Sequence, residues 1–144
     1  MKKYLTSEIS FDVPDEWIQS SINIFPNLKV FGKDFSLVIT RDKVEMDQAL
    51  DAYVDEQNSK QLEMLPDFKI IKREDIKVSD VTACGVHFQW KDNNGLKIQY
   101  QVYIPLPNNF YIILTGTTVE DFSSSHEEVF NTILSTLIFN KGKE

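Results

Sequence analysis

Alternating hydrophobic and polar residues predict that most of this chain forms β-strands. In the first third of the chain the pattern predicts strands at residues 8–13, 18–25 and 35–40. Four more predicted strands follow in the second half, at residues 68–74, 81–90, 96–104 and 109–118. Ile22 and Ile24 are two residues apart in the second strand, so their side chains point to the same side of it.

Two segments show the spacing of a helix instead. Residues 47–65 have one apolar stripe, and Pro66 ends the segment. The stripe consists of Leu50, Tyr53, Val54, Met64 and Leu65. The last helix is expected to begin near Ser124 or Ser125, with Glu127 or Glu128 completing a capping box. Its apolar face would be Phe130, Ile133, Leu134 and Leu137. The order of elements predicts an α+β domain with a mostly antiparallel β-sheet and two packed α-helices.

The strands at 81–90 and 96–104 are predicted to form a hairpin. Placing the apolar residues of both strands on one face pairs Trp90 with Ile98, which requires a three-residue loop at 93–95. Gly95 would then adopt a left-handed conformation. This register leaves one sheet face as core and gathers polar groups on the other. Those polar groups are His87, Gln89, Gln99, Gln101 and Tyr103.

The length, the charge and the hydropathy of the chain limit the number of domains, the kinds of partner and the expected location. A length of 144 residues fits one domain, which we take as residues 1–144. The net charge of −7 disfavours nucleic acid as a partner. The N-terminus lacks the apolar run of a secretory signal, and no window approaches the ~20 apolar residues of a membrane span. We therefore expect a cytoplasmic protein that is not itself a membrane protein.

The residues that most often carry catalysis or bind metals are scarce. Cys84, His87 and His126 are too few for a convincing zinc site, and no cofactor motif is present. Cys84 and His87 are three residues apart on a predicted strand, so they point to opposite faces and cannot act as nucleophile and base. We expect Cys84 to be a core thiol and His126 to occupy a solvated capping position. The chain is expected not to be an enzyme and to need neither a cofactor nor a metal.

Glutamines are the more informative polar residues. Gln57 and Gln61 fall near the centre of the apolar stripe of the first helix, where buried amides need hydrogen-bond partners. They could belong to an internally bonded core, to a subunit contact, or to a surface that receives a ligand with both apolar and polar groups. Ile22 and Ile24 would supply the apolar part of such a surface if their face does not point into the core.

Several segments together resemble a known family. They are DVPDEWIQSSINIF, FSLVITRD, YVDEQ, LPDFKI and IQYQVYI, in this order. The chain resembles the Eag chaperones of bacterial type VI secretion systems, a branch of the DcrB-like group with a PsbP-like α+β fold. The likeness spans roughly residues 4–138, and its most specific part is P-D-x-W followed by S-I-N-I-F.

The resemblance implies a non-enzymatic, homodimeric chaperone that binds the hydrophobic N-terminal transmembrane region of a secreted effector before export. By position in the motifs, its client-binding residues would be Ile22, Ile24, Val38, Gln57, Gln61 and Gln101. The predicted hairpin register adds Gln89 and Gln99. Two alternatives stay open, which are an adaptor of the same fold for a soluble partner and a small-ligand-binding domain.

Overall fold

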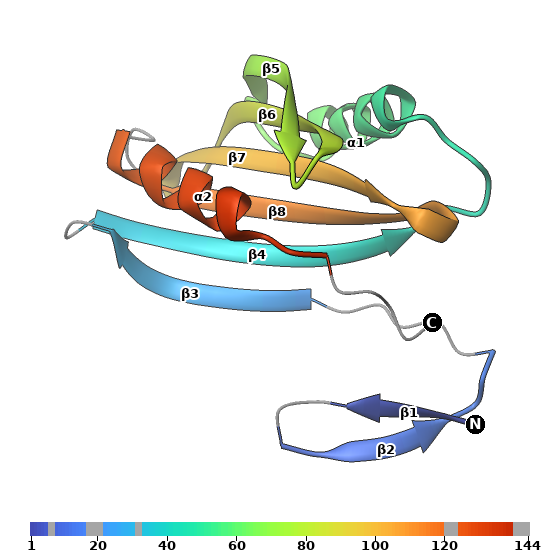
Figure 1. Cartoon of the computed structure of the whole chain (residues 1–144). Coiled ribbons are helices and arrows are strands. Elements are labelled where there is room, and N and C mark those ends of the chain that lie inside the picture. The colour runs from blue at the N-terminus through green and yellow to red at the C-terminus, as the bar shows by residue number, and fades with distance from the viewer. Residues whose placement is uncertain (6–7, 17–21, 31–32, 120–123, 140–144) are drawn as a thin grey trace.

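A six-stranded antiparallel sheet forms the body of the protein in the computed structural model (Figure 1). The structure describes residues 1–5, 8–16, 22–30, 33–119 and 124–139. The strand order across the sheet is β3-β4-β8-β7-β6-β5. The strands are β3 (Ile22–Val30), β4 (Lys33–Lys43), β5 (Lys69–Val78), β6 (Val81–Asp92), β7 (Gly95–Leu106) and β8 (Phe110–Thr118). All six were predicted from the alternation. β4, β6 and β7 are longer than predicted, β3 and β5 extend further toward the C-terminus, and β8 begins one residue later. Residues 18–21 of the predicted second strand lie outside the described residues.

A separate two-stranded sheet lies at the N-terminus, formed by β1 (Lys2–Leu5) and β2 (Ser10–Val13). In Figure 1 it lies apart from the six-stranded sheet. The sequence predicts β2 but not β1, because two consecutive lysines interrupt the alternation of β1. The tryptophan of the P-D-x-W motif, Trp17, lies outside the described residues.

Two helices pack on opposite faces of the six-stranded sheet, α1 (Leu50–Met64) and α2 (Ser124–Thr136). A 3-10 turn, η1 (Pro107–Asn109), joins β7 to β8. The core under α1 contains Tyr53, Val54, Cys84, Val86, Phe88, Tyr103, Tyr111 and Ile113. The core under α2 contains Phe35, Leu37, Val78, Ala83, Tyr100, Val102, Ile104, Leu114, Phe130 and Leu134. The expectation of a single core face is therefore wrong, because the central strands carry apolar residues on both sides.

The predicted hairpin register is also wrong. The loop between β6 and β7 has two residues, Asn93 and Asn94, and Asp92 pairs with Gly95. The Asn94 N–H donates to the Asp92 carboxylate at 2.8 Å, which closes the tight turn. Trp90 consequently pairs with Lys97 and not with Ile98. Only the left-handed conformation of Gly95 is confirmed, with φ of 117°.

The one-residue change in register exchanges the two sides of β7 relative to β6. Gln99, Gln101 and Tyr103 lie on the α1 face, together with Phe88 and Trp90. His87 and Gln89 belong to the opposite, α2 face, where the His87 ring stacks on Tyr100 with centroids 3.9 Å apart. The amide-rich face is thus smaller than predicted and includes the aromatic residues of β6.

The helix faces follow the predicted stripes with two exceptions. Tyr53 and Val54 are buried as expected, but Met64 is 78% exposed. The last buried residue of α1 is Asn58, and in the final helical turn Leu62, Glu63 and Met64 are exposed. His126 is completely buried rather than solvated, because the first turn of α2 packs its imidazole against the ring of Phe35. The predicted capping serines have side chains outside the described residues.

Candidate functional site

The face of the sheet under α1 is covered by that helix only in part. α1 packs on β6 and β7, and the Tyr53 ring stacks on Tyr111 of β8 at 3.9 Å between centroids. Ile22 and Ile24 of β3 belong to the same face, because Ile22 pairs with Thr40, which pairs with the core residue Ile113. These two isoleucines are 65% and 60% exposed. The part of the face beyond α1 is therefore apolar and accessible.

We call this surface the open face. It is made of residues that pair across β3, β4 and β8, so they share one side of the sheet. Its members are Ile22, Ile24, Val38, Thr40, Thr115 and Thr117. All four β4 and β8 members are half-buried, and they form a floor beside the two exposed isoleucines.

Polar contacts outside the open face hold α1 in place. The Tyr53 hydroxyl donates to the Asp42 carboxylate at 2.7 Å, and the Tyr111 hydroxyl donates to the Gln48 carbonyl at 2.7 Å. Burial raises the pKa of Tyr53, so this phenol stays protonated and keeps donating. On the other side of α1, the Arg73 guanidinium of β5 pairs with Asp55. These contacts hold α1 in one orientation. In that orientation, the side of the helix with Gln57 and Gln61 lies along the border of the open face.

Two rows of hydrogen bonds run across the strands, from the part of this face that α1 covers to the open face. In the first, the Gln61 amide N–H donates to Gln101 Oε1 at 2.8 Å, and Gln101 Nε2 donates to Thr115 Oγ1 at 3.1 Å. The Tyr103 hydroxyl also donates to Gln101 Oε1. In the second, Trp90 Nε1 donates to Gln99 Oε1 at 2.7 Å, and Gln99 Nε2 donates to Thr117 Oγ1 at 2.9 Å.

The structure shows whether the glutamine amides are bonded internally or border an accessible surface. Gln61, Gln99 and Gln101 are internally bonded, and they also border the accessible surface, so the two interpretations are compatible. Two buried acceptors on α1, Asn58 Oδ1 and Gln61 Oε1, have no hydrogen-bond partner within the part of the chain that the structure describes.

Most of the predicted client-binding residues lie in this region. Those at or beside the open face are Ile22, Ile24, Val38, Gln57, Gln61, Gln99 and Gln101. Gln89 is separated from them, because it pairs with Ile98 on the α2 face. Sequence reasoning missed Thr115 and Thr117. The T-G-T alternation at 115–117 is the signal that places both hydroxyls on one side of β8.

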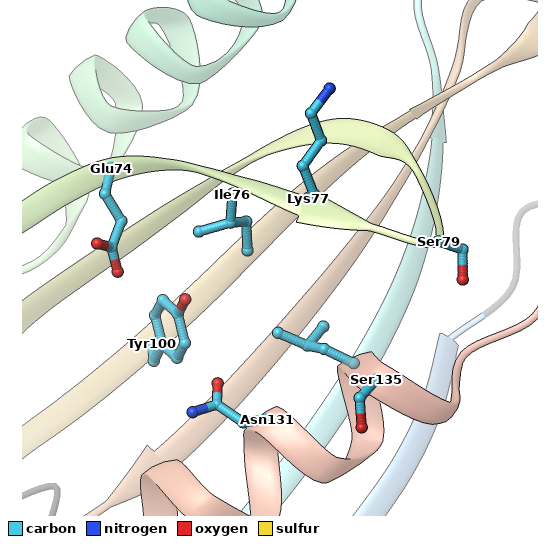
Figure 2. A pocket seen from close by; sticks show the side chains of 8 residues that line it. Glu74, Ile76, Lys77, Ser79, Tyr100, Asn131 and Ser135 are labelled. Carbon is cyan, nitrogen blue, oxygen red and sulfur yellow. The ribbon is translucent and has the colours of Figure 1, made fainter.

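A small cleft lies on the other face of the sheet, between β5 and α2 (Figure 2). Its volume is about 250 Å³, and Figure 2 shows it open between the strand and the helix, with the Lys77 side chain directed away from it. The lining residues are Glu74, Ile76, Lys77, Ser79, Tyr100, Asn131, Leu134 and Ser135. None of the predicted client-binding residues lines this cleft, so it does not extend the open face.

Other kinds of site have little support in the described ranges. Within them, no three histidine, cysteine, aspartate or glutamate side chains gather closely enough to hold a metal ion. Nor does any helix in these ranges have the length and apolar character needed to cross a bilayer. Cys84 is buried as predicted, and burial raises the pKa of its thiol.

A model of the DcrB family matches residues 8–136, almost the whole described chain. The chain belongs to the DcrB family. A protein of Pseudomonas aeruginosa named Effector EagT6 is 31% identical over 140 residues, which cover 96% of both chains. The resemblance to the Eag branch of the DcrB-like group is thereby confirmed, and so is membership in an effector-associated family.

Solved structures agree with the fold. The crystal structure of PA94, a Pseudomonas aeruginosa protein of unknown function, matches with a TM-score of 0.83 and 29% identity over 99% of both chains. LpqN of Mycobacterium tuberculosis matches with a TM-score of 0.54 and 15% identity, over 85% of this chain and 78% of that one. CyanoP, the PsbP protein of Synechocystis sp. PCC 6803, matches with a TM-score of 0.53 and 10% identity, over 85% and 94% of the two chains. The α+β, PsbP-like fold predicted from the sequence is confirmed.

Proposed function

We propose that this DcrB-family member is a cytoplasmic, non-enzymatic chaperone that binds the hydrophobic N-terminal transmembrane region of a type VI secretion effector before export. The observation that carries the proposal is the accessible apolar strip of Ile22 and Ile24, next to Val38 and the two amide rows. Family membership supports an effector as the partner.

The chemistry of the open face suits a membrane-spanning helix. Such a helix exposes ~20 apolar residues, which would aggregate in water unless a carrier covers them. The exposed isoleucines offer apolar contact, and the rows that end at Thr115 and Thr117 offer hydrogen bonds. Helices in membranes associate through the same combination of close packing and side-chain hydrogen bonds. The open face would therefore stand in for a neighbouring helix.

The proposal is tested by placing a charge on the strip. Ile22→Asp and Ile24→Asp should leave a folded protein, because both side chains are mostly exposed without a client. Each should weaken binding of the effector's hydrophobic segment by about tenfold or more, since the complex would bury an unpaired carboxylate. Ile71→Asp is the matched control: Ile71 is 54% exposed but lies on β5, at the opposite edge of the sheet.

The measurement is co-purification of each variant with the effector segment, together with a thermal melt of the variant alone. Binding by the control and not by the two strip variants supports the proposal. Unfolding of Ile22→Asp would identify these isoleucines as core residues, and undiminished binding by both strip variants would place the client elsewhere.

A further inference from the structure

The polarity of the Trp90–Gln99–Thr117 row is fixed by the indole. A tryptophan N–H can only donate, so the Gln99 atom that faces Trp90 at 2.7 Å must be the carbonyl oxygen. The amide nitrogen of Gln99 then faces Thr117, and Thr117 Oγ1 must accept from it at 2.9 Å. The threonine hydroxyl cannot use its own proton in that bond.

The second row has the same polarity. The carbonyl oxygen of Gln101 receives two donors, the Gln61 amide and the Tyr103 hydroxyl. Burial raises the pKa of Tyr103, so its hydroxyl stays protonated and can donate to Gln101 Oε1. With its oxygen bonded to these two donors, Gln101 directs its amide nitrogen to Thr115 and donates to Thr115 Oγ1 at 3.1 Å.

Both rows thus end in hydrogen-bond donors at the open face. Each threonine hydroxyl accepts from a glutamine and keeps its proton for another partner. Neither proton has an acceptor among the described residues, although both threonines are half-buried. Each glutamine amide also has a second N–H, while its oxygen is occupied on the covered side.

The spacing of the two donors matches a helix. Thr115 and Thr117 are two residues apart on β8, which separates them by roughly 6.8 Å along the strand. Side chains at i and i+4 of a helix are roughly 6 Å apart along its axis and lie on the same face. A helix lying along β8 can therefore present one acceptor to each hydroxyl, with its apolar flank against Val38 and Ile24.

We propose that Thr115 and Thr117 are specificity-determining residues, which donate hydrogen bonds to oxygen acceptors at positions i and i+4 of an apolar client helix. This inference rests on the proposed function and narrows it, because it says which polar groups the apolar segment should contain. Side-chain oxygens of Ser, Thr or Asn at that spacing fit the two donors. Ammonium and guanidinium groups, which only donate, do not.

The experiment uses synthetic helical peptides that differ only in an acceptor. The host is a labelled 20-residue Leu/Ala helix with Gly-Ser-Lys ends. One peptide contains O-methylserine at i and i+4, and the other contains norvaline, which has the same shape without the oxygen. The wild-type protein should bind the O-methylserine peptide about threefold to tenfold more tightly. Affinities are measured by fluorescence anisotropy at physiological salt.

Variants of the two threonines then test whether their hydroxyls cause the preference for the O-methylserine peptide. Thr115→Val and Thr117→Val retain the shape and lose the proton, so in the double variant the two peptides should bind equally. Thr115→Ser and Thr117→Ser should keep the preference for the O-methylserine peptide. That result would show that the hydroxyl causes the preference and the threonine methyl group does not. Thr82→Val, which lies on β6 opposite Lys77 of the edge strand β5, is the matched control and should behave as wild type.

Each remaining outcome is decisive. If wild type binds both peptides equally, or if the double valine variant keeps the preference, the donor proposal is wrong while binding of an apolar helix stands. If wild type binds neither peptide, both the proposed function and this inference are overturned.

Discussion

At the scale of single residues, burial decides which groups can change their charge. The His87 ring is half-buried and stacks on Tyr100 with an interplanar angle of 6°. Burial lowers the pKa of His87, and the carboxylates of Glu127 and Glu74 oppose this shift only in part, while Lys72 adds to it. Burial also raises the pKa of Tyr100 to about 12. The pair is therefore neutral at pH 7.

The lowered pKa of His87 predicts a stability loss in mild acid. Below pH ~6.5 the unfolded chain binds the proton more readily than the folded protein, so the free energy of unfolding falls as the pH decreases through that value. The contribution of His87 should be below about 1 kcal/mol between pH 7.5 and 5.5, because the residue is only partly buried and solvent screens its charge.

Urea unfolding at the two pH values, in wild type and in His87→Phe, measures this contribution. The phenylalanine ring keeps the stacking on Tyr100 and cannot titrate, so the variant should lose less stability on acidification. Equal losses in the two proteins would show that the carboxylates alone account for the acid sensitivity.

Individual residues were predictable where one property decided their position. The apolar environment of Cys84 followed from its neighbours, and the glutamines stood out because amides on an apolar stripe need partners. Their partners could not be predicted, because Gln61 and Gln101 are forty residues apart in the chain. The burial of His126 was missed because its neighbours Glu127 and Glu128 are polar, while its own ring packs on Phe35.

At the scale of elements, the close approach of α2 to β8 depends on Gly116. A Cβ atom at this position would lie 2.9 Å from Phe130 Cε2 and 3.0 Å from Phe35 Cε2. Both distances are far below ordinary van der Waals contact, and both rings are buried. The glycine therefore lets the helix pack directly onto the strand, between the two threonines that face the other way.

Gly116→Ala should destabilise the protein by about 1 to 3 kcal/mol, because the added methyl group forces the two rings to move within a packed core. The expected reading is a lower melting temperature. Phe130→Leu is the compensating variant, since the smaller leucine side chain leaves room for part of the added methyl group. The double variant should lose less stability than the sum of the single variants, and strict additivity would contradict the packing explanation.

Apart from β1, the order and type of the strands and α-helices could be predicted from the sequence, but the register between β6 and β7 could not. The large apolar residues of β6, such as Phe88 and Trp90, face α1, whereas those of β7, such as Tyr100, face α2. Merging two apolar faces therefore favoured the wrong pairing. The segment DNNG fits loops of two or three residues, and only the tertiary packing of two helices selects between them.

At the scale of the whole molecule, the two edges of the sheet differ in character. β5 is rich in charged residues, which protect an edge strand from unwanted pairing. β3 begins instead with the exposed apolar residues Ile22, Ile24 and Phe25. The N-terminal sheet adds two more exposed apolar residues, Phe11 in β2 and Ile9 directly before it. Among the described residues, exposed large apolar side chains are thus denser in the first 25 residues than in the rest of the chain, where Leu62, Met64, Ile70 and Ile71 are among those exposed.

This distribution, together with the family resemblance, predicts a two-fold homodimer. A two-stranded sheet is marginally stable by itself, and a second copy of the chain would cover it. Light scattering at micromolar concentration should give twice the chain mass of 16.7 kDa. A mass equal to one chain at that concentration would contradict the prediction.

The hydrogen bond between Trp90 and Gln99 gives the protein an optical reporter of its own occupancy. The indole is at one end of a row whose other end, Thr117, faces the proposed client. The chain has two tryptophans, so Trp17→Phe leaves Trp90 as the single tryptophan. Any client that engages the Thr117 hydroxyl polarises the Gln99 amide and excludes water from the same region, and both effects alter the emission of the indole. Client capture and release can therefore be followed in real time by intrinsic fluorescence, without attaching a dye to the protein or to its cargo.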